Sequence, residues 1–187
     1  PVQPEDTTAT PGWIERTFPV PGVTVSLPAE WIFRYEPMVP ALMTWSAEPP
    51  DEPQKSNGMW PYLMEEPIAQ VNFINLPYDA ELHADLAATL ASSFTSYEAS
   101  LGAINPDGNT TVVEEPTLLT INGQPAAKMV VEGTDIVLQK PFRTYVYAIH
   151  SGDQILLVSS ALVEANEAAF VPLVEQIVQS VAVGAPQ

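Results

Sequence analysis

The chain has 187 residues, 46% of them hydrophobic, which is enough to bury the core of one domain. It carries 23 acidic and 6 basic residues, and the resulting net charge of −17 disfavours binding to nucleic-acid phosphates and anionic lipid headgroups. No run of about 18 apolar residues is present, so no segment is expected to span a bilayer. The absence of cysteine excludes disulfides, zinc–cysteine sites and thiol catalysis.

Residues 1–12 are rich in proline, threonine and acidic side chains and show no apolar periodicity, which is typical of a flexible tether. Residues 13–187 are then expected to form one domain. A cysteine-free, acidic domain behind such a tether indicates a bacterial protein outside the cytoplasm, either secreted or tethered to a membrane. A lipid anchor upstream of Pro1 would fit this expectation.

The domain opens with two short segments that alternate apolar and polar side chains, residues 13–20 and 23–27. Turn residues Pro21 and Gly22 separate them, so the pattern predicts a β-hairpin. Residues 31–35 and 68–75 are expected to be further extended segments.

A helix is predicted to follow Asp79, which can cap its N-terminus. Apolar side chains recur there at spacings of three or four residues and form one stripe, which Gly102 is placed to end. The members of this stripe are Leu82, Leu86, Leu90, Phe94, Tyr97 and Leu101.

Strands are predicted again at residues 110–114 and 117–121, and Asn122-Gly123 is a strong hairpin turn into residues 125–133. Residues 142–162 predict a second hairpin. A turn at Ser151-Gly152 would place His150 opposite Asp153, and both faces of this hairpin would be apolar. A hairpin that is apolar on both faces must be covered on both faces.

A second helical stripe near the C-terminus can supply one of the two covers, and Pro172 is expected to restart or kink that helix near its beginning. One helix for each face predicts an α+β fold, a three-layer α/β/α sandwich with a central antiparallel sheet. The second stripe consists of Phe170, Val174, Ile177, Val178 and Val181.

Several short stretches resemble PsbP-like domains. LPAEW, at the end of an opening strand, resembles a turn motif of that family, and INGQPAAKMVVEG, the hairpin 142–162 and a helix ending in IVQSV follow in the same order. The resemblance covers residues 13–183. It implies an α/β/α sandwich and a small non-catalytic scaffold that binds, because family members include a photosystem II subunit, a factor that binds a small GTPase, and bacterial lipoproteins. No shared catalytic motif exists, so no functional residue is carried over.

Three groups of residues suggest catalytic or metal sites, but each has a simpler interpretation. His150 with Asp153 near the Ser159-Ser160 pair is two-thirds of a hydrolase triad at best, and a polar pair at a solvated turn is the simpler interpretation. Asp79 and His83 are four residues apart, but two ligands do not make a metal site. Acidic pairs such as Glu65-Glu66 point to opposite sides of an extended chain. No catalytic residue, metal site or cofactor is therefore predicted.

The segment 36–67 departs from the family pattern, since it is long, rich in proline and holds four of the five methionines. Methionine and tryptophan are enriched at binding surfaces, but a core plug is the favoured interpretation, because large exposed apolar patches are rare on monomers. The side chains of this connector that remain exposed are the candidate contact surface. The candidates are Trp45, Met59, Trp60, Tyr62 and Met64.

The leading hypothesis from sequence is therefore a non-enzymatic domain that binds another protein, preferably a basic one, or assists its assembly. The first alternative is a carrier of a small molecule or lipid held between connector and sheet. The second is a hydrolase whose site residues meet only in three dimensions.

Overall fold

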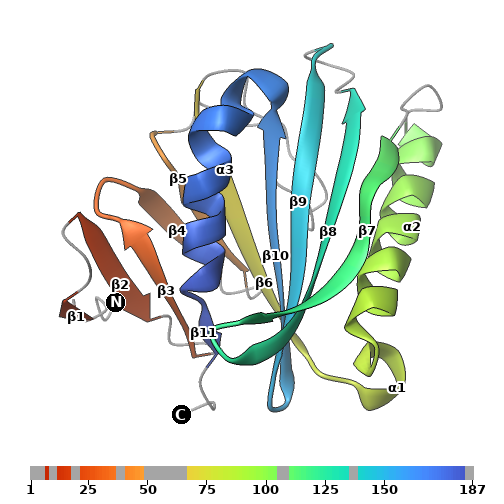
Figure 1. The fold of residues 1–187 in the computed structure, drawn as a ribbon, viewed down its shortest axis with the longest axis horizontal. Helices are drawn as coiled ribbons and strands as arrows, with labels where there is room; N and C mark the ends of the chain where they lie inside the picture. The colour runs from red at the N-terminus through yellow and green to blue at the C-terminus, as the bar shows by residue number, and fades with distance from the viewer. Residues whose placement is uncertain are drawn as a thin grey trace.

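The computed structural model describes residues 7–8, 12–17, 22–36, 41–48, 67–104, 110–134 and 139–183. The larger of its two sheets has seven antiparallel strands in the spatial order β4-β5-β6-β10-β9-β8-β7 (Figure 1). These strands are β4 (Ile32–Glu36), β5 (Ala41–Trp45), β6 (Gln70–Pro77), β7 (Thr110–Ile121), β8 (Gln124–Thr134), β9 (Pro141–Ser151) and β10 (Gln154–Val163).

The smaller sheet brings both ends of the described chain together. Its order is β1 (Thr7–Thr8), β2 (Trp13–Thr17), β3 (Val23–Pro28) and β11 (Ala182–Val183). The predicted hairpin is confirmed, because β2 and β3 pair in antiparallel fashion. The separate sheet itself was not predicted, since β11 contributes only two residues and joins β3 across the length of the sequence.

The helices are α1 (Ala80–His83), α2 (Leu86–Ile104) and α3 (Glu164–Gln179). Alternate residues of β9 show that α2 and α3 cover opposite faces of the large sheet. Tyr147 and Ile149 share a core cluster with α3 and the small sheet, whereas Val146 and Ala148 share one with α2. Figure 1 shows α3 in front of the large sheet, the small sheet to the left of α3, and α2 next to β7 at the right-hand edge of the large sheet. The predicted three-layer arrangement is therefore confirmed.

The two-faced hairpin β9–β10 is confirmed, but its turn lies one residue later than predicted. Gly152 has a φ of 60°, a conformation that glycine adopts without strain, and Ser151 pairs with Gln154. His150 therefore lies opposite Ile155 rather than opposite Asp153. The register moves by two residues, so every side chain keeps its predicted face.

The predicted helix after Asp79 is interrupted. The cap is confirmed, since the Asp79 carboxylate accepts a hydrogen bond of 2.8 Å from the backbone N–H of Glu81. However, Asp85 accepts a second one of 3.0 Å from the N–H of Ala88 and so caps a new helix, α2. Leu82 lies before this break and is 70% exposed, so the buried stripe starts later than expected. Among the members whose side chains the structure describes, Leu86, Leu90 and Phe94 are buried, and the side chains of Tyr97 and Leu101 lie outside this description.

Gly102, which was expected to end a helix, lies inside α2, and Pro172, which was expected to restart or kink a helix near its beginning, lies in the middle of α3. Helix α2 continues past Gly102, and α3 runs from Glu164 to Gln179 through Pro172. A proline inside a helix costs about 3 kcal/mol. The burial of three branched side chains of α3 offsets this cost. These are Val174, Ile177 and Val178.

Regular structure was underestimated in two other places. The proline-rich connector 36–67 contains β5, because the five residues between Pro40 and Ser46 include no proline and can pair between β4 and β6. The two strands predicted around Pro116 are one strand, β7, whose register shifts on either side of Glu114. A bulge accommodates the residues that the ladder cannot pair.

Within the described part of the chain, no helix combines the length and the apolarity needed to cross a membrane.

Candidate functional site

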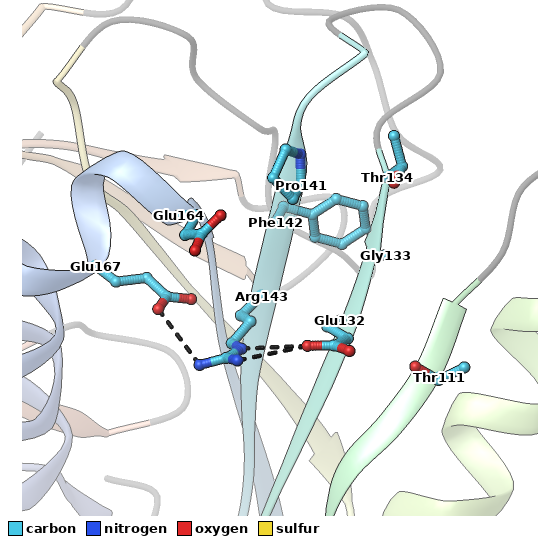
Figure 2. Close-up of a pocket in the computed structure, with 9 residues that line it drawn as sticks. All are labelled: Thr111, Glu132, Gly133, Thr134, Pro141, Phe142, Arg143, Glu164 and Glu167. Carbon is cyan, nitrogen blue, oxygen red and sulfur yellow. Dashed lines mark hydrogen bonds and ion pairs between the residues drawn. The ribbon is translucent and has the colours of Figure 1, made fainter.

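A pocket of about 330 Å³ opens where the end of β8, the start of β9 and the first turn of α3 meet (Figure 2). Its walls combine acidic, basic and apolar side chains from four elements. They are Thr111 of β7, Glu132, Gly133 and Thr134 of β8, Pro141, Phe142 and Arg143 of β9, and Glu164 and Glu167 of α3.

Strand register and chain connection explain why these charges meet. Glu132 and Arg143 are direct cross-strand partners in the β8–β9 ladder. Helix α3 begins immediately after β10, and the last residue of β10, Val163, pairs with Phe142 near the start of β9. The first turn of α3, which carries Glu164 and Glu167, therefore lies at the end of the sheet where β9 begins. Carboxylates are favoured at that position by the helix dipole. The pocket therefore gathers three carboxylates around one guanidinium.

The ion pairs in the pocket are long. Arg143 Nε lies 3.4 Å from Glu132 Oε2, and Arg143 Nη1 lies 3.5 Å from Glu167 Oε2 (Figure 2). The side chains of Arg143 and Glu132 are 46% and 45% exposed, whereas that of Glu167 is only 17% exposed. Exposed pairs of this kind contribute little stability. Arg143 therefore balances only part of the acidic charge.

Glu167 is the least satisfied group of the site. Its Oε1 is fully buried and has no hydrogen-bond partner among the described residues. Burial raises the pKa of its carboxyl above the ordinary value, and the nearby Arg143 lowers it only in part. A buried carboxylate oxygen without a hydrogen bond is unusual in a folded protein.

The pocket combines apolar surface with carboxylates. Phe142 and Pro141 offer apolar surface for the stem of a lysine or arginine, and the carboxylates face its charge. Neither histidine lines the pocket. The described residues also contain no group of three or more side chains able to hold a metal ion.

The structure separates the contact residues predicted from sequence. Trp45 lies in β5 and is 2% exposed, packed with Ile32, Met43 and Ile68 in a small core cluster. It is part of the core and is not accessible to a partner in this structure. Met59, Trp60, Tyr62 and Met64 lie outside the described residues.

The histidines have local partners. His150 stacks on Tyr78 with ring centroids 4.0 Å apart, and its Nε2 lies 2.9 Å from the carbonyl oxygen of Gly152. His83 Nδ1 accepts a hydrogen bond from the N–H of Asp79 at the start of α1. Ser159 and Ser160 are buried neighbours on one strand, so they face opposite sides of the sheet. No triad is assembled from these described residues.

The pocket residues were missed from the sequence. One signal was available: only six basic residues exist, and Arg143 sits at the start of an otherwise apolar hairpin. A rare basic residue in an acidic chain is expected to have acidic partners, but the partners of Arg143 come from segments far apart in the chain and could not be identified from the sequence.

Neither known family models nor curated protein sequences match this chain. Solved structures do. The cyanobacterial PsbP (CyanoP) from Synechocystis sp. PCC 6803 superposes with a TM-score of 0.59 at 13% identity, covering 95% of each chain. LpqN, involved in cell envelope biogenesis of Mycobacterium tuberculosis, gives 0.54 at 12% identity, covering 96% of this chain and 90% of its own.

A protein from Bacteroides thetaiotaomicron VPI-5482 gives a TM-score of 0.51 at 8% identity. The match takes in 98% of this chain but 49% of that protein, so this chain spans about half of its length. At such identities the likeness concerns the fold alone. The chain has a PsbP-like fold.

Proposed function

We propose that this protein is a non-enzymatic binding domain outside the cytoplasm, and that its α3 pocket holds a cationic side chain of a basic partner protein. The observation that carries the proposal is the Glu167 carboxylate, with one fully buried oxygen that has no donor among the described residues. Glu167 lines a pocket that holds three carboxylates and one guanidinium, and Arg143 pairs with two of those carboxylates, Glu132 and Glu167. A lysine ammonium or a second guanidinium bound in the pocket would offset its excess negative charge.

The charge of the whole chain supports the same partner chemistry. A net charge of −17 attracts basic proteins over a distance and raises their rate of encounter. The pocket then provides a specific contact within this general attraction. The location outside the cytoplasm rests on the tether composition and the lack of cysteine.

The carrier alternative has no comparable support. A lipid carrier needs a pocket lined mainly by apolar groups. Four of the nine lining residues here are charged, so an apolar ligand would strip water from them without replacing their hydrogen bonds.

The test is an NMR titration with a lysine blocked at both ends, and with blocked norleucine as the neutral analogue of similar shape. We expect the lysine analogue alone to shift the backbone amides of the pocket, and Glu167→Gln to weaken its binding about tenfold, as expected for the loss of one charge-assisted hydrogen bond.

The matched control is Glu81→Gln, which removes the same charge from exposed α1 at the opposite end of the sheet (Figure 1). Equal binding of both analogues would contradict the proposal. So would equal weakening by Glu81→Gln, because attraction would then be general and not located in the pocket.

A further inference from the structure

Strand β7 forms one edge of the large sheet and pairs with β8 alone among the described strands (Figure 1). The edge of a sheet presents backbone N–H and C=O groups that can pair with another chain. Proteins usually protect such an edge with charges, proline or bulges. The two halves of β7 differ in this respect.

The first half of β7 is protected. Its register shifts between Val112 and Glu114 and again between Glu114 and Thr117. The second irregularity contains Glu115 and Pro116, so charge, proline and bulge occur together. An added strand would find no regular ladder here.

The second half, from Thr117 to Ile121, has a regular register and no charged residue. The two-residue turn at Asn122-Gly123 makes Ile121 and Gln124 a hydrogen-bonded pair, so every second residue back along β7 also bonds to β8. The residues between them, Leu118 and Thr120, therefore direct their N–H and C=O groups outward. Pro125, the partner of Thr120, agrees with this pattern, since it has no N–H to give.

Three of the five side chains of this half are also exposed, whereas Leu119 and Ile121 pack on the core. Leu118 is 71% exposed, although it lies in a strand, and Thr117 and Thr120 are exposed as well. Among the described residues only three large apolar side chains are exposed, and two of them, Val113 and Leu118, belong to β7. A strand added beside Leu118 would cover it and satisfy the outward backbone groups.

We infer that Thr117–Ile121 is a strand-addition site for an extended, basic segment of a partner protein. Glu114 and Glu115 precede this half in the same strand, and the chain carries a net charge of −17, so basic residues in the added segment are favoured and a second copy of this chain is disfavoured. The inference adds a mode of contact to the binding role proposed above and rests on it, but its test does not involve the pocket.

The probe is a short blocked peptide that alternates lysine and valine. Its matched control has the same side chains but an N-methyl group on every backbone amide, which abolishes donation along both edges of the peptide while the charge stays the same. On binding, we expect the outward amides of Leu118 and Thr120 to become protected from hydrogen exchange. The control peptide should bind about tenfold more weakly, as expected for the loss of a backbone hydrogen bond.

Thr120→Pro removes one outward N–H and none that bonds to β8, and proline is tolerated on edge strands. We expect it to weaken peptide binding and to leave the unfolding midpoint nearly unchanged, whereas Glu167→Gln leaves peptide protection at β7 intact. Failure of the pocket with success at β7 would therefore reject only the pocket. Equal binding of the N-methylated peptide, or protection elsewhere than β7, would overturn the inference. So would a dimer in sedimentation that Thr120→Pro dissociates, since the occupant would then be a second copy.

Discussion

Arg143 of β9 and Glu167 of α3 form an ion pair of 3.5 Å that leaves one oxygen of the carboxylate buried and without a partner among the described residues. The pair joins the sheet to the first turn of the helix, but its electrostatic attraction is smaller than the desolvation cost of burying the Glu167 carboxylate. The pKa of this carboxyl is raised for the same reason, because burial disfavours the charged form more than Arg143 favours it. Carboxyl groups with perturbed pKa values of this kind occur commonly at binding sites.

Replacing Glu167 with glutamine should make the protein less sensitive to pH. Because the folded-state pKa of Glu167 is raised, the folded protein holds this proton more tightly than the unfolded chain, and its stability falls as pH rises through the window between the two values. The free energy of unfolding of Glu167→Gln, measured relative to that of the wild type, should therefore increase as the pH rises from about pH 4. Urea unfolding at several pH values measures this difference. A difference that is constant, or that has the opposite slope, would show that burial does not dominate at Glu167.

Lys128 and Glu175 form the second link between α3 and the sheet. Lys128 Nζ lies 3.3 Å from Glu175 Oε1 and 3.8 Å from Glu114 Oε2, and 5.7 and 6.0 Å from the ring centroids of Tyr145 and Tyr147. Its side chain is only 22% exposed. A double-mutant cycle with Lys128→Met and Glu175→Gln should give a coupling of about 0.5–1 kcal/mol that shrinks in high salt. A coupling near zero at low salt would mean that the rings, not the carboxylate, hold the lysine.

Trp45 should behave as a core residue. Because it is 2% exposed, Trp45→Ala should lower the free energy of unfolding by about 3–5 kcal/mol. Its indole Nε1 is buried without a hydrogen-bond partner among the described residues. Trp45→Phe removes this unpaired donor together with some apolar area, so its cost should be about 1 kcal/mol or less. Chemical denaturation of both variants provides the comparison. A small cost for Trp45→Ala would instead return this residue to the contact surface predicted from sequence.

The β7–β8 turn should depend on its glycine. Gly123 has a φ of 78° and Asn122 one of 46°, and Asn122 Nδ2 donates a hydrogen bond of 3.3 Å to the carbonyl oxygen of Val181. Gly123→Ala should cost about 1–2 kcal/mol, because a Cβ is unfavourable at that φ. Nothing lies within 4 Å of the added atom, so the cost is one of backbone conformation and not of collision. Gly123→Asn is the matched variant and should cost less, since asparagine tolerates positive φ. Thermal unfolding ranks the two, and a larger loss for Asn would contradict this explanation.

The three layers could be predicted because each one follows from a local pattern. The hairpin from Phe142 to Leu162 is apolar on both faces, and a helical stripe stands on either side of it in the sequence. Burial of those faces admits one arrangement, with α2 and α3 on opposite sides. The errors arose where a local signal was weak or ambiguous, as at Asp85, which caps a new helix, and at β5, hidden among prolines.

The periodicity of apolar residues along the chain thus determined the sandwich, because each apolar face of a strand or helix must be buried against another element. Pairing of distant segments decided the rest. The two-residue β11 follows α3 and pairs with β3 across the length of the sequence, and Glu132, Arg143 and Glu167 become neighbours only through strand register and the start of α3. Charged residues carry no period that reveals their partners, so the tertiary structure alone brings the acidic pocket together.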